Sequence, residues 1–341
     1  MKKIIPHRII ISRTDAIGDV ILTLPAAGLI KKYFPECRII FFGRTYTKAV
    51  VDACEHVDEF INYDDFTSLP GRERPTFLSH VNADAIVHVF PRPDIAAASK
   101  AANIHFRIGT TNRLYHWWTC NRLIPSGRKN SDLHEAQLNV KLLRPFGITN
   151  SFHPEALKNY LGLKKTIPLP EVLLRFLSKD KFNLLLHPKS NTSAREWSLE
   201  NYRELILMLP PEKFNPIVTG TNKEKELMKE WLSALPQHVQ DATGRMSLHE
   251  LISFIGHADG LVAASTGPLH IAGALGKHAL GIYSPIRPMH PGRWAAIGDR
   301  AEFLVATKTC SSCRTKPTLC HCMNEISPKQ VAERILGWKK G

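Results

Sequence analysis

The chain has 341 residues, of which 43% are hydrophobic and 22% charged, and its formal net charge is +14. This length exceeds one ordinary core and suits two domains of roughly 150 residues each, while the composition excludes a disordered chain. The sequence has no signal-peptide pattern and no apolar run of about 18 residues, so we expect a cytoplasmic protein without a membrane span. The positive charge favours nucleic acid, phosphorylated sugars or an anionic membrane as partners.

The first half of the chain alternates predicted strands and helices. A β-branched run at residues 7–12 precedes a polar loop with Gly18 and a helical pattern at 20–33, which is the opening of a βαβ unit. Further strands are predicted at 38–42, 59–63, 83–89 and 105–109, and helices at 94–102 and 134–146. This alternation indicates a parallel sheet with helices on both faces.

A segment with several prolines and no clear period, residues 150–170, is predicted to link this half to a second unit. In that unit the predicted strands are 182–186, 216–219, 261–264 and 279–283, and the predicted helices are 199–209, 223–235, 247–257 and 268–275. The sequence therefore predicts an α/β fold of two Rossmann-like domains, residues 1–165 and 166–341, facing across a cleft. Ligands of such sheets lie outside the carboxyl ends of the strands.

The loop after the first strand contains a candidate general base. Asp19 falls near the start of the next helix, where unpaired N–H groups and the helix dipole favour an ionised carboxylate. A carboxylate there can take the proton from an attacking sugar hydroxyl. A simple helix cap is the alternative role for Asp19, and Asp15 is the alternative base. The loop lacks G-x-G-x-x-G, which disfavours an NAD enzyme.

A second loop, residues 187–197, follows a buried strand and concentrates hydroxyls, an amide and cations. Such a loop can hold a diphosphate with help from the N–H groups of the next helix, and Arg195 would neutralise a departing phosphate. The alternative is a solvated loop in which Ser198 caps the helix.

A third loop, residues 265–270, follows the apolar run 261–264. Gly267 permits close backbone approach and Pro268 suits the first helical position, so a helix N-terminus would face an anion. Capping and packing alone explain this loop almost as well, and His270 also fits a core position.

Two weaker signals for function lie outside these three loops. Glu224 and Glu226 open a helix where a carboxylate can accept hydrogen bonds from a ribose, although helix-dipole stabilisation explains them too. Cysteines 310, 313, 320 and 322 gather near the C-terminus, where free thiols are favoured over a zinc site.

Cations and aromatic rings also mix in one stretch, which suits an anionic lipid-linked sugar, a membrane interface or single-stranded nucleic acid, unless its tryptophans are core residues. Its members are Arg107, Arg113, Tyr115, His116, Trp117, Trp118, Arg122, Arg128 and Lys129.

Together these segments resemble the family 9 glycosyltransferases, the ADP-heptose:lipopolysaccharide heptosyltransferases and their relatives. The resemblance covers nearly the whole chain and is carried, in order, by residues 13–20 with Leu24-Pro25, His187-Pro188, Arg195-Glu196-Trp197, and 265–270 with Gly276. It implies a GT-B architecture, no cofactor or obligatory metal, and inversion at the sugar carbon.

The resemblance implies Asp19 rather than Asp15 as the catalytic base, assisted by Arg195. The implied residues of the donor site are His187, Ser190, Thr192, Arg195, Trp197, Glu224 or Glu226, Ser265, Thr266, Gly267, Pro268 and His270. The acceptor is expected at Arg13, Thr14, Asp15, Gly18, Arg92, Lys100, Arg107 and Arg113. Many members have Asp at the position of Ser265, which touches the donor sugar, so heptose is a first expectation.

We therefore expect an inverting transfer of heptose from ADP-heptose to the lipopolysaccharide inner core of a Gram-negative bacterium. The expected partners are a nucleotide sugar, an anionic lipid-linked saccharide and the cytoplasmic face of the inner membrane, with no nucleic acid. The alternatives are another nucleotide sugar, an epimerase or hydrolase on the same scaffold, and a non-catalytic protein that binds nucleic acid or anionic surfaces with strong salt dependence.

Overall fold

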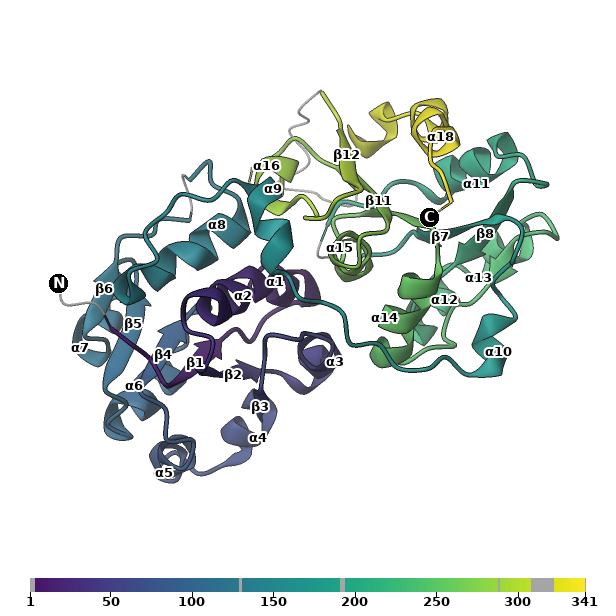
Figure 1. The fold of residues 1–341 in the computed structure, drawn as a ribbon. Coiled ribbons are helices and arrows are strands. Elements are labelled where there is room, and N and C mark those ends of the chain that lie inside the picture. The colour runs from purple at the N-terminus through teal and green to yellow at the C-terminus, as the bar shows by residue number, and fades with distance from the viewer. Residues whose placement is uncertain (1–3, 129–130, 191–193, 288, 308–321, 341) are drawn as a thin grey trace. The chain divides into compact units, whose positions relative to one another are not determined.

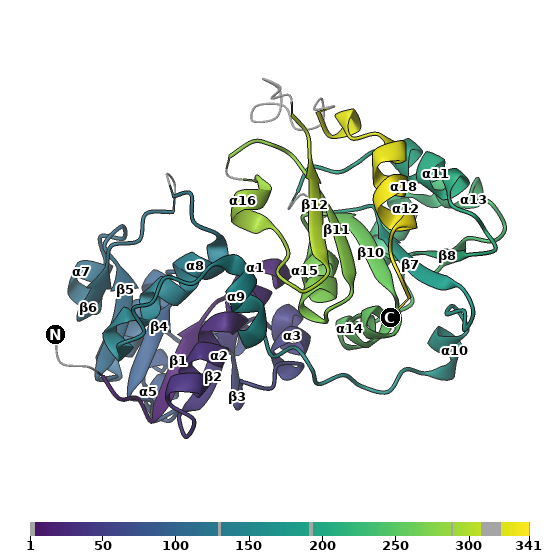
Figure 2. The same ribbon diagram turned by 45° about the horizontal axis from the view of Figure 1, so that its top comes forward.

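The computed structural model describes residues 4–128, 131–190, 194–287, 289–307 and 322–340. The chain divides into two compact units, Met1–Lys165 (unit 1) and Thr166–Gly341 (unit 2). Each unit has one sheet of six described strands, and all neighbouring strands pair in parallel (Figures 1 and 2). The predicted α/β fold is confirmed. No helix in the described ranges is long and apolar enough to cross a bilayer.

In unit 1 the strands lie in the order β3-β2-β1-β4-β5-β6. Their bounds are β1 (Arg8–Ser12), β2 (Arg38–Gly43), β3 (Glu59–Asn62), β4 (Ala85–His88), β5 (Phe106–Thr110) and β6 (Arg122–Ile124). The central strands are continuous apolar runs because helices cover both of their faces. The strand order reverses between β1 and β4, so the loops after these two strands diverge.

The helices of unit 1 cover both faces of this sheet. On one face, side chains from α4, α5 and α6 pack on Ile10, Ile40 and Ile86 of the sheet. Helices α2 and α8 are not part of this cluster and pack against each other. The bounds are α1 (Ile17–Ile21), α2 (Leu24–Tyr33), η1 (Thr45–Thr47), α3 (Lys48–Asp52), α4 (Tyr63–Ser68), α5 (Arg74–Ser79), α6 (Pro93–Ala101), α7 (His116–Thr119), α8 (Glu135–Val140), η2 (Lys141–Phe146), α9 (Pro154–Leu157) and η3 (Lys158–Tyr160).

Unit 2 repeats the strand order of unit 1, as β12-β11-β10-β7-β8-β9. The bounds are β7 (Phe182–His187), β8 (Phe214–Val218), β9 (Gln240–Asp241), β10 (Gly260–Ala264), β11 (His278–Tyr283) and β12 (Ala301–Val305). The reversal of strand order now falls between β7 and β10. Both units therefore have the doubly wound arrangement typical of nucleotide-binding sheets.

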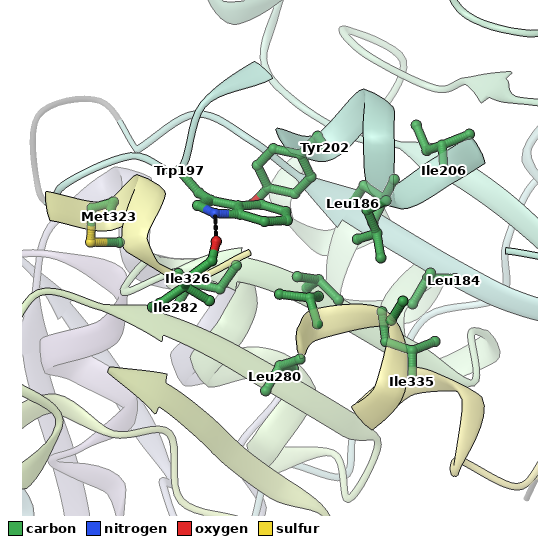
Figure 3. Close-up of a cluster of buried hydrophobic side chains, with 14 of the residues drawn as sticks. Leu184, Leu186, Trp197, Tyr202, Ile206, Leu280, Ile282, Met323, Ile326 and Ile335 are labelled. Atoms are coloured by element: carbon green, nitrogen blue, oxygen red, sulfur yellow. Dashed lines mark hydrogen bonds between the residues drawn. The ribbon is translucent and has the colours of Figure 1, made fainter. Parts of the chain in front are cut away.

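One face of the unit 2 sheet is covered by α11 and α18, which pack side by side (Figure 3). Helices α14 and α15 pack against each other, and α15 contacts β10 and β11. The bounds are α10 (Glu171–Leu174), α11 (Leu199–Met208), α12 (Asn222–Leu227), α13 (Lys229–Ser233), α14 (Leu248–His257), α15 (Gly267–Ala274), α16 (Pro291–Trp294), η5 (Cys322–Glu325) and α18 (Pro328–Leu336).

The segment predicted as a linker is ordered up to the boundary of unit 1. Leu157, Leu161 and Leu163 are buried, and Leu163 forms a β-bridge with Cys54. The structure of residues 154–163 was not predicted because two short helices and a bridge are too brief to leave a periodic pattern in sequence. The boundary between the two units, after Lys165, falls within the predicted linker.

Candidate functional site

In unit 1 the candidate site lies where the strand order reverses. Strands β1 and β4 are neighbours, and their last residues, Ser12 and His88, pair in register. The loops that follow therefore start side by side at the carboxyl edge of the sheet, where ligands of doubly wound sheets bind. Asp19 lies in the first of these loops and Arg92 in the second.

Arg13 is the centre of the first loop and is almost fully buried. Its guanidinium donates to Asp15 through Nε at 2.6 Å, to Glu135 through Nη1 at 2.9 Å and to Asp19 through Nη2. Burial lowers the pKa of Arg13, but the three carboxylates outweigh it and raise the pKa above the ordinary value. Arg13 is thus a permanent cation that fixes the loop.

Asp19 lies inside α1, whose N-cap residue is Ala16, so it does not cap the helix. Burial is the main cause that raises the pKa of Asp19, to about 7, with Asp15 and Glu135 adding repulsion and Arg13 opposing it. A carboxylate with a pKa near the working pH can take and release a proton. Its side chain is 18% exposed, so solvent reaches it.

Sequence reasoning missed the residues that support Arg13 from α8 and the loop before it. Glu135 pairs with both Arg13 and Arg128, at 2.9 and 3.1 Å. Asn139 accepts from Arg13 at 3.3 Å and donates to the carbonyl of Leu22 at 3.0 Å. These residues lie more than 110 positions from Arg13, so no local pattern connects them.

The second loop supplies a further cation at the same edge. Arg92 donates through Nε to the hydroxyl of Thr14 at 3.0 Å, and its guanidinium lies over the rings of Tyr63 and Phe90. Arg113 follows β5 at the same edge of the sheet and is exposed. The structure thus brings Arg13, Thr14, Asp15, Gly18, Asp19 and Arg92 to one edge.

The structure corrects the prediction for Lys100 and Arg107. Helix α6 runs from the carboxyl end of β4 to the amino end of β5, so Lys100 in its last turn lies at the opposite edge of the sheet. Arg107 also lies near the amino end of β5, where its guanidinium donates to the carbonyls of Thr119 and Ile104. Both basic residues therefore lie away from the carboxyl edge of the sheet, where Asp19 lies.

His88 was also missed, and it is fully buried at the end of β4. Neither ring nitrogen has a hydrogen-bond partner among the described residues, and the ring lies 5.5 Å from that of His116. Burial, reinforced by His116, lowers the pKa of His88 to about 3. His88 is therefore neutral at physiological pH.

In unit 2 the reversal of strand order places the loops after β7 and β10 side by side. His187 ends β7, is buried, and has Nδ1 at 3.0 Å from the hydroxyl of Thr219. Burial lowers the pKa of His187, opposed by Glu224 and Glu196, which therefore lie near it.

In the loop after β7, several donors bind the carboxylate of Glu196, a residue of the same loop. Ser190 donates its backbone N–H and its hydroxyl to Glu196 at 2.9 and 3.2 Å, and Lys189 pairs with the same carboxylate at 2.8 Å. These donors form a cradle of the kind that binds an anion. Arg195 is partly buried in this loop, and Thr192 lies outside the described residues.

The loop after β10 leads directly into α15, which begins at Gly267 with Pro268 in its first turn. Thr266 is the N-cap residue, yet its hydroxyl makes no cap bond and has no partner within the described ranges, although it is only 4% exposed. Ser265 instead bonds to Tyr283, and His270 is buried in the helix. The start of α15 thus offers unpaired donors at the switch point.

Glu224 and Glu226 are separated clearly by the structure. Glu224 is buried and accepts from the N–H and the hydroxyl of Thr221 in a capping box, using one of its two oxygens, Oε2. Glu226 is exposed one half-turn further along α12. Of the two carboxylates, it is that of Glu224 whose charge acts to raise the pKa of His187.

The structure corrects the prediction that Trp197 is a residue of the donor site. Its ring is 1% exposed, packs edge-on against Tyr202, and donates its indole N–H to the carbonyl of Ile326 at 2.8 Å (Figure 3). The ring thus lies in the core between α11 and the segment before α18. Its role is to position the loop that carries Arg195 and Glu196.

Within the described residues, no cluster of three His, Cys, Asp or Glu side chains is suited to a metal ion. Cysteines 310, 313 and 320 lie outside those residues, and Cys322 is buried.

Two doubly wound units, each with candidate ligand loops at its switch point, define the GT-B class of glycosyltransferases. The sequence model of glycosyltransferase family 9 (heptosyltransferase) matches residues 96–324. The chain belongs to this family, and it is a glycosyltransferase.

Relatives and solved structures agree with this assignment. Over 313 residues the chain is 26% identical to a Haemophilus influenzae protein provisionally named a glycosyltransferase, covering 86% of this chain and 87% of that protein. It is 23% identical to the lipopolysaccharide core heptosyltransferase OpsX of the same organism, covering 83% and 81%.

The fold is similar to that of a family 9 glycosyltransferase from Veillonella parvula, with a TM-score of 0.79, 16% identity and coverage of 97% and 96%. It is also similar to the Escherichia coli ADP-heptose heptosyltransferase II, with a TM-score of 0.74, 16% identity and coverage of 96% and 97%.

Proposed function

We propose that this enzyme transfers heptose from ADP-heptose to an anionic, lipid-linked saccharide of the lipopolysaccharide core, at the cytoplasmic face of the inner membrane. In the proposed displacement, a hydroxyl oxygen of the acceptor attacks the anomeric carbon with inversion. Asp19 receives the hydroxyl proton, the bond from the anomeric carbon to the phosphate oxygen breaks, and ADP leaves.

The observation that carries this proposal is the state of Asp19. Its carboxylate lies at the switch point of unit 1, reaches solvent, and has a pKa raised to about 7 chiefly by burial. A general base works best when its pKa is near the working pH. Arg13 holds the carboxylate in place, and Arg92 with Arg113 supplies positive charge for a phosphorylated acceptor.

For the donor we propose the edge of unit 2 formed by the loops after β7 and β10. The cradle of Lys189 and Ser190 now holds the Glu196 carboxylate, and a diphosphate offers the same acceptor chemistry with more charge. The unpaired hydroxyl of Thr266 and the start of α15 add donors, and Arg195 adds a cation that stabilises the leaving group. We propose that Glu224 contacts the ribose.

The name of the OpsX relative, a lipopolysaccharide core heptosyltransferase, supports the proposed acceptor. The name of the similar E. coli structure, an ADP-heptose heptosyltransferase, supports the proposed donor. The position of Ser265 beside Tyr283 is where we expect the donor sugar to be selected.

Calorimetric titration with ADP, UDP and GDP, at moderate salt and without added metal, tests the donor. We expect binding of ADP in clear preference to the other two nucleotides. Preference for UDP or GDP would keep the fold but change the donor. Absence of binding to all three would overturn the assignment of the unit 2 edge.

Substitution of Asp19 tests the base. We expect Asp19→Asn to lower the transfer rate about 10²–10⁴-fold while ADP affinity is unchanged. In the wild type, kcat/KM should rise with pH up to about 7 and then level off, because the raised pKa keeps Asp19 protonated below that pH. If Asp15→Asn abolishes transfer and Asp19→Asn does not, the role belongs to Asp15.

A further inference from the structure

An exposed apolar patch lies on unit 1, in the loop after β5 and in α7. Leu114, Trp117 and Trp118, here called the aromatic patch, are 77%, 59% and 62% exposed. The chain has six tryptophans, all within the described residues, and only these two are exposed. Exposed large apolar side chains that lie together mark a surface that meets a partner.

The charge around the aromatic patch favours an anionic partner. The segment that carries the aromatic patch, residues 110–122, includes the cations Arg113 and Arg122 and no Asp or Glu. Among these cations, Arg113 is exposed and adjoins Leu114 in the chain. Indole rings partition to the headgroup level of a bilayer, and neighbouring cations are attracted to anionic lipids.

The loop that leads into the aromatic patch starts at the same edge of the sheet as the candidate site of unit 1. Strand β5 ends at Thr110, so the loop that carries Leu114 begins at the carboxyl edge of the sheet, the edge at which Asp19 lies. Helix α7 packs on α6 and β5, and both views show it beside β6 at the end of the sheet (Figures 1 and 2). Tyr115 interacts electrostatically with Arg92.

The geometry points to the aromatic patch as the surface by which unit 1 docks on an anionic lipid bilayer, and we propose this role for it. Trp117 and Trp118 insert among the headgroups and Arg113 faces anionic lipid. The indole N–H of Trp117 donates to the carbonyl of Thr111 at 3.1 Å, which holds that ring against its loop. The purpose of docking rests on the proposed function, because a lipid-linked acceptor then meets the edge that carries Asp19.

Vesicle co-sedimentation of the full chain tests the docking itself. We compare the wild type with the double variant Trp117→Ser, Trp118→Ser, using vesicles of phosphatidylethanolamine with phosphatidylglycerol and vesicles of phosphatidylcholine alone. The wild type should bind the anionic vesicles, lose most of this binding at high salt, and bind phosphatidylcholine weakly. The double variant should bind the anionic vesicles about tenfold or more weakly.

A matched control uses two leucines of unit 2 with similar exposure, Leu207 at 63% and Leu227 at 65%. The double variant Leu207→Ser, Leu227→Ser should bind anionic vesicles like the wild type. The proposal is overturned if the wild type binds neither vesicle, or if the tryptophan variant binds as well as this control. Equal loss in both variants would also overturn it, since general surface hydrophobicity would then explain the binding.

Transfer assays separate this proposal from the proposed function. With acceptor embedded in anionic vesicles, the tryptophan variant should lose about tenfold or more of its rate, while transfer to a delipidated, water-soluble acceptor is unchanged. Asp19→Asn should show the reverse pattern, with normal vesicle binding and no transfer to either acceptor. A wild type that binds vesicles but transfers no heptose would overturn the proposed function and leave the docking surface standing.

Discussion

Arg13 joins three carboxylates that come from both ends of unit 1, and all four groups are largely withdrawn from water. A buried charge without a partner costs several kcal/mol, so each carboxylate depends on Arg13 and Arg13 depends on them. Burial is the main cause that raises the pKa of Asp19, repulsion from Asp15 and Glu135 adds to the rise, and Arg13 opposes it. The same burial that orders the loop thus prepares Asp19 to accept a proton.

The raised pKa of Asp19 has a measurable cost in stability. A carboxyl whose folded pKa is raised to about 7 destabilises the fold progressively as the pH rises from about 4 to 7. Asp19→Asn removes that cost, so we expect the free energy of unfolding of unit 1 to rise by about 1–3 kcal/mol at pH 8. At pH 4 the gain should vanish. Urea unfolding at both pH values checks this, and equal gains at both would contradict it.

His88 predicts the opposite dependence on pH. Because its folded pKa is lowered to about 3, it resists protonation in the fold while the unfolded chain takes up a proton below about 6.5. Stability is therefore complete above 6.5 and is lost as the pH falls, by up to about 1.4 kcal/mol for each pH unit. We expect His88→Leu to flatten this loss between pH 6.5 and 5.

Hydrogen exchange of β1 and β4 at these two pH values measures the effect, and the exposed His80 provides the control. His80→Leu should keep the wild-type slope. An unchanged slope in His88→Leu would show that the ring is hydrated in solution and titrates normally.

At this scale the sequence indicated the loop residues well and their partners poorly. Asp19, Arg13 and Arg92 lie next to strand ends, so a pattern of strands alone brought them to one edge. Glu135, Asn139 and His88 are defined by contacts across the fold, and nothing in their own neighbourhood distinguishes them. Lys100 and Trp197 were misplaced for a related reason, because residue type alone does not reveal which edge or which side of a helix a side chain occupies.

Among the elements, the strands that were predicted agree with the structure to within a few residues, whereas β6, β9 and β12 were not predicted and the first helix was predicted as one. Residues 20–33 form two helices, α1 and α2, rather than one. Pro25 has no N–H and favours the first turn of a new helix. Thr23 is the N-cap residue of α2, but its hydroxyl makes no cap hydrogen bond and instead donates to the carbonyl of Asp19 at 2.8 Å. The break ends α1 just after Asp19, which keeps this residue near a helix end and near solvent.

Strand β12 and helix α18 were missed for different reasons. The strand Ala301–Val305 is partly exposed along its length and does not alternate. Helix α18 has a capping box of Ser327 and Gln330 and a clear apolar face, both of which are readable in the sequence.

Helix α2 is tied to the end of unit 1 through Gly28. A Cβ atom at this position would lie 2.3 Å from the carbonyl oxygen of Tyr160 in η3. We expect Gly28→Ala to push η3 away and to lower the free energy of unfolding of unit 1 by about 1–3 kcal/mol. Hydrogen exchange of residues 24–33 and 154–163 should speed up while unit 2 is unchanged.

The control for this prediction is Gly71→Ala, since a Cβ atom there meets nothing within 4 Å. This variant should change stability by about 0.5 kcal/mol or less. Equal effects in both variants would mean that helix α2 does not depend on the segment 154–163.

At the scale of the whole molecule, the same strand order appears twice, and each unit has its own core. The two halves were recognisable in the sequence because the alternation of strand and helix restarts after residue 170. The boundary itself, at Lys165 and Thr166, falls in a stretch without regular structure. We therefore expect a core substitution in one unit to leave the other unit intact.

Ile335 tests this independence. It is fully buried in α18 against the core that includes Leu184 and Leu186 (Figure 3). Ile335→Ala should destabilise unit 2 by about 2–5 kcal/mol, because it leaves a cavity in that core. Hydrogen exchange of β7 reports unit 2, and hydrogen exchange of β1 reports unit 1, which should not change.

The neighbouring Leu336 is 50% exposed and provides the control. Leu336→Ala should cost about 0.5 kcal/mol or less. A loss of protection in β1 upon substitution of Ile335 would mean that the two units unfold together.

The packing of α18 on α11 also sets an order of events during protein synthesis. Unit 1 ends at Lys165, so it can acquire its fold on the ribosome while unit 2 is still being translated. Unit 2 cannot close its core until α18 has been made, because Val331 and Ile335 fill the face between β7 and α11. Until then the nascent chain exposes Trp197, Tyr202 and Leu205, a surface on which chaperones bind and proteases act. Unit 2 can therefore complete its fold only after α18 has been translated, and until then it remains open to chaperones and proteases.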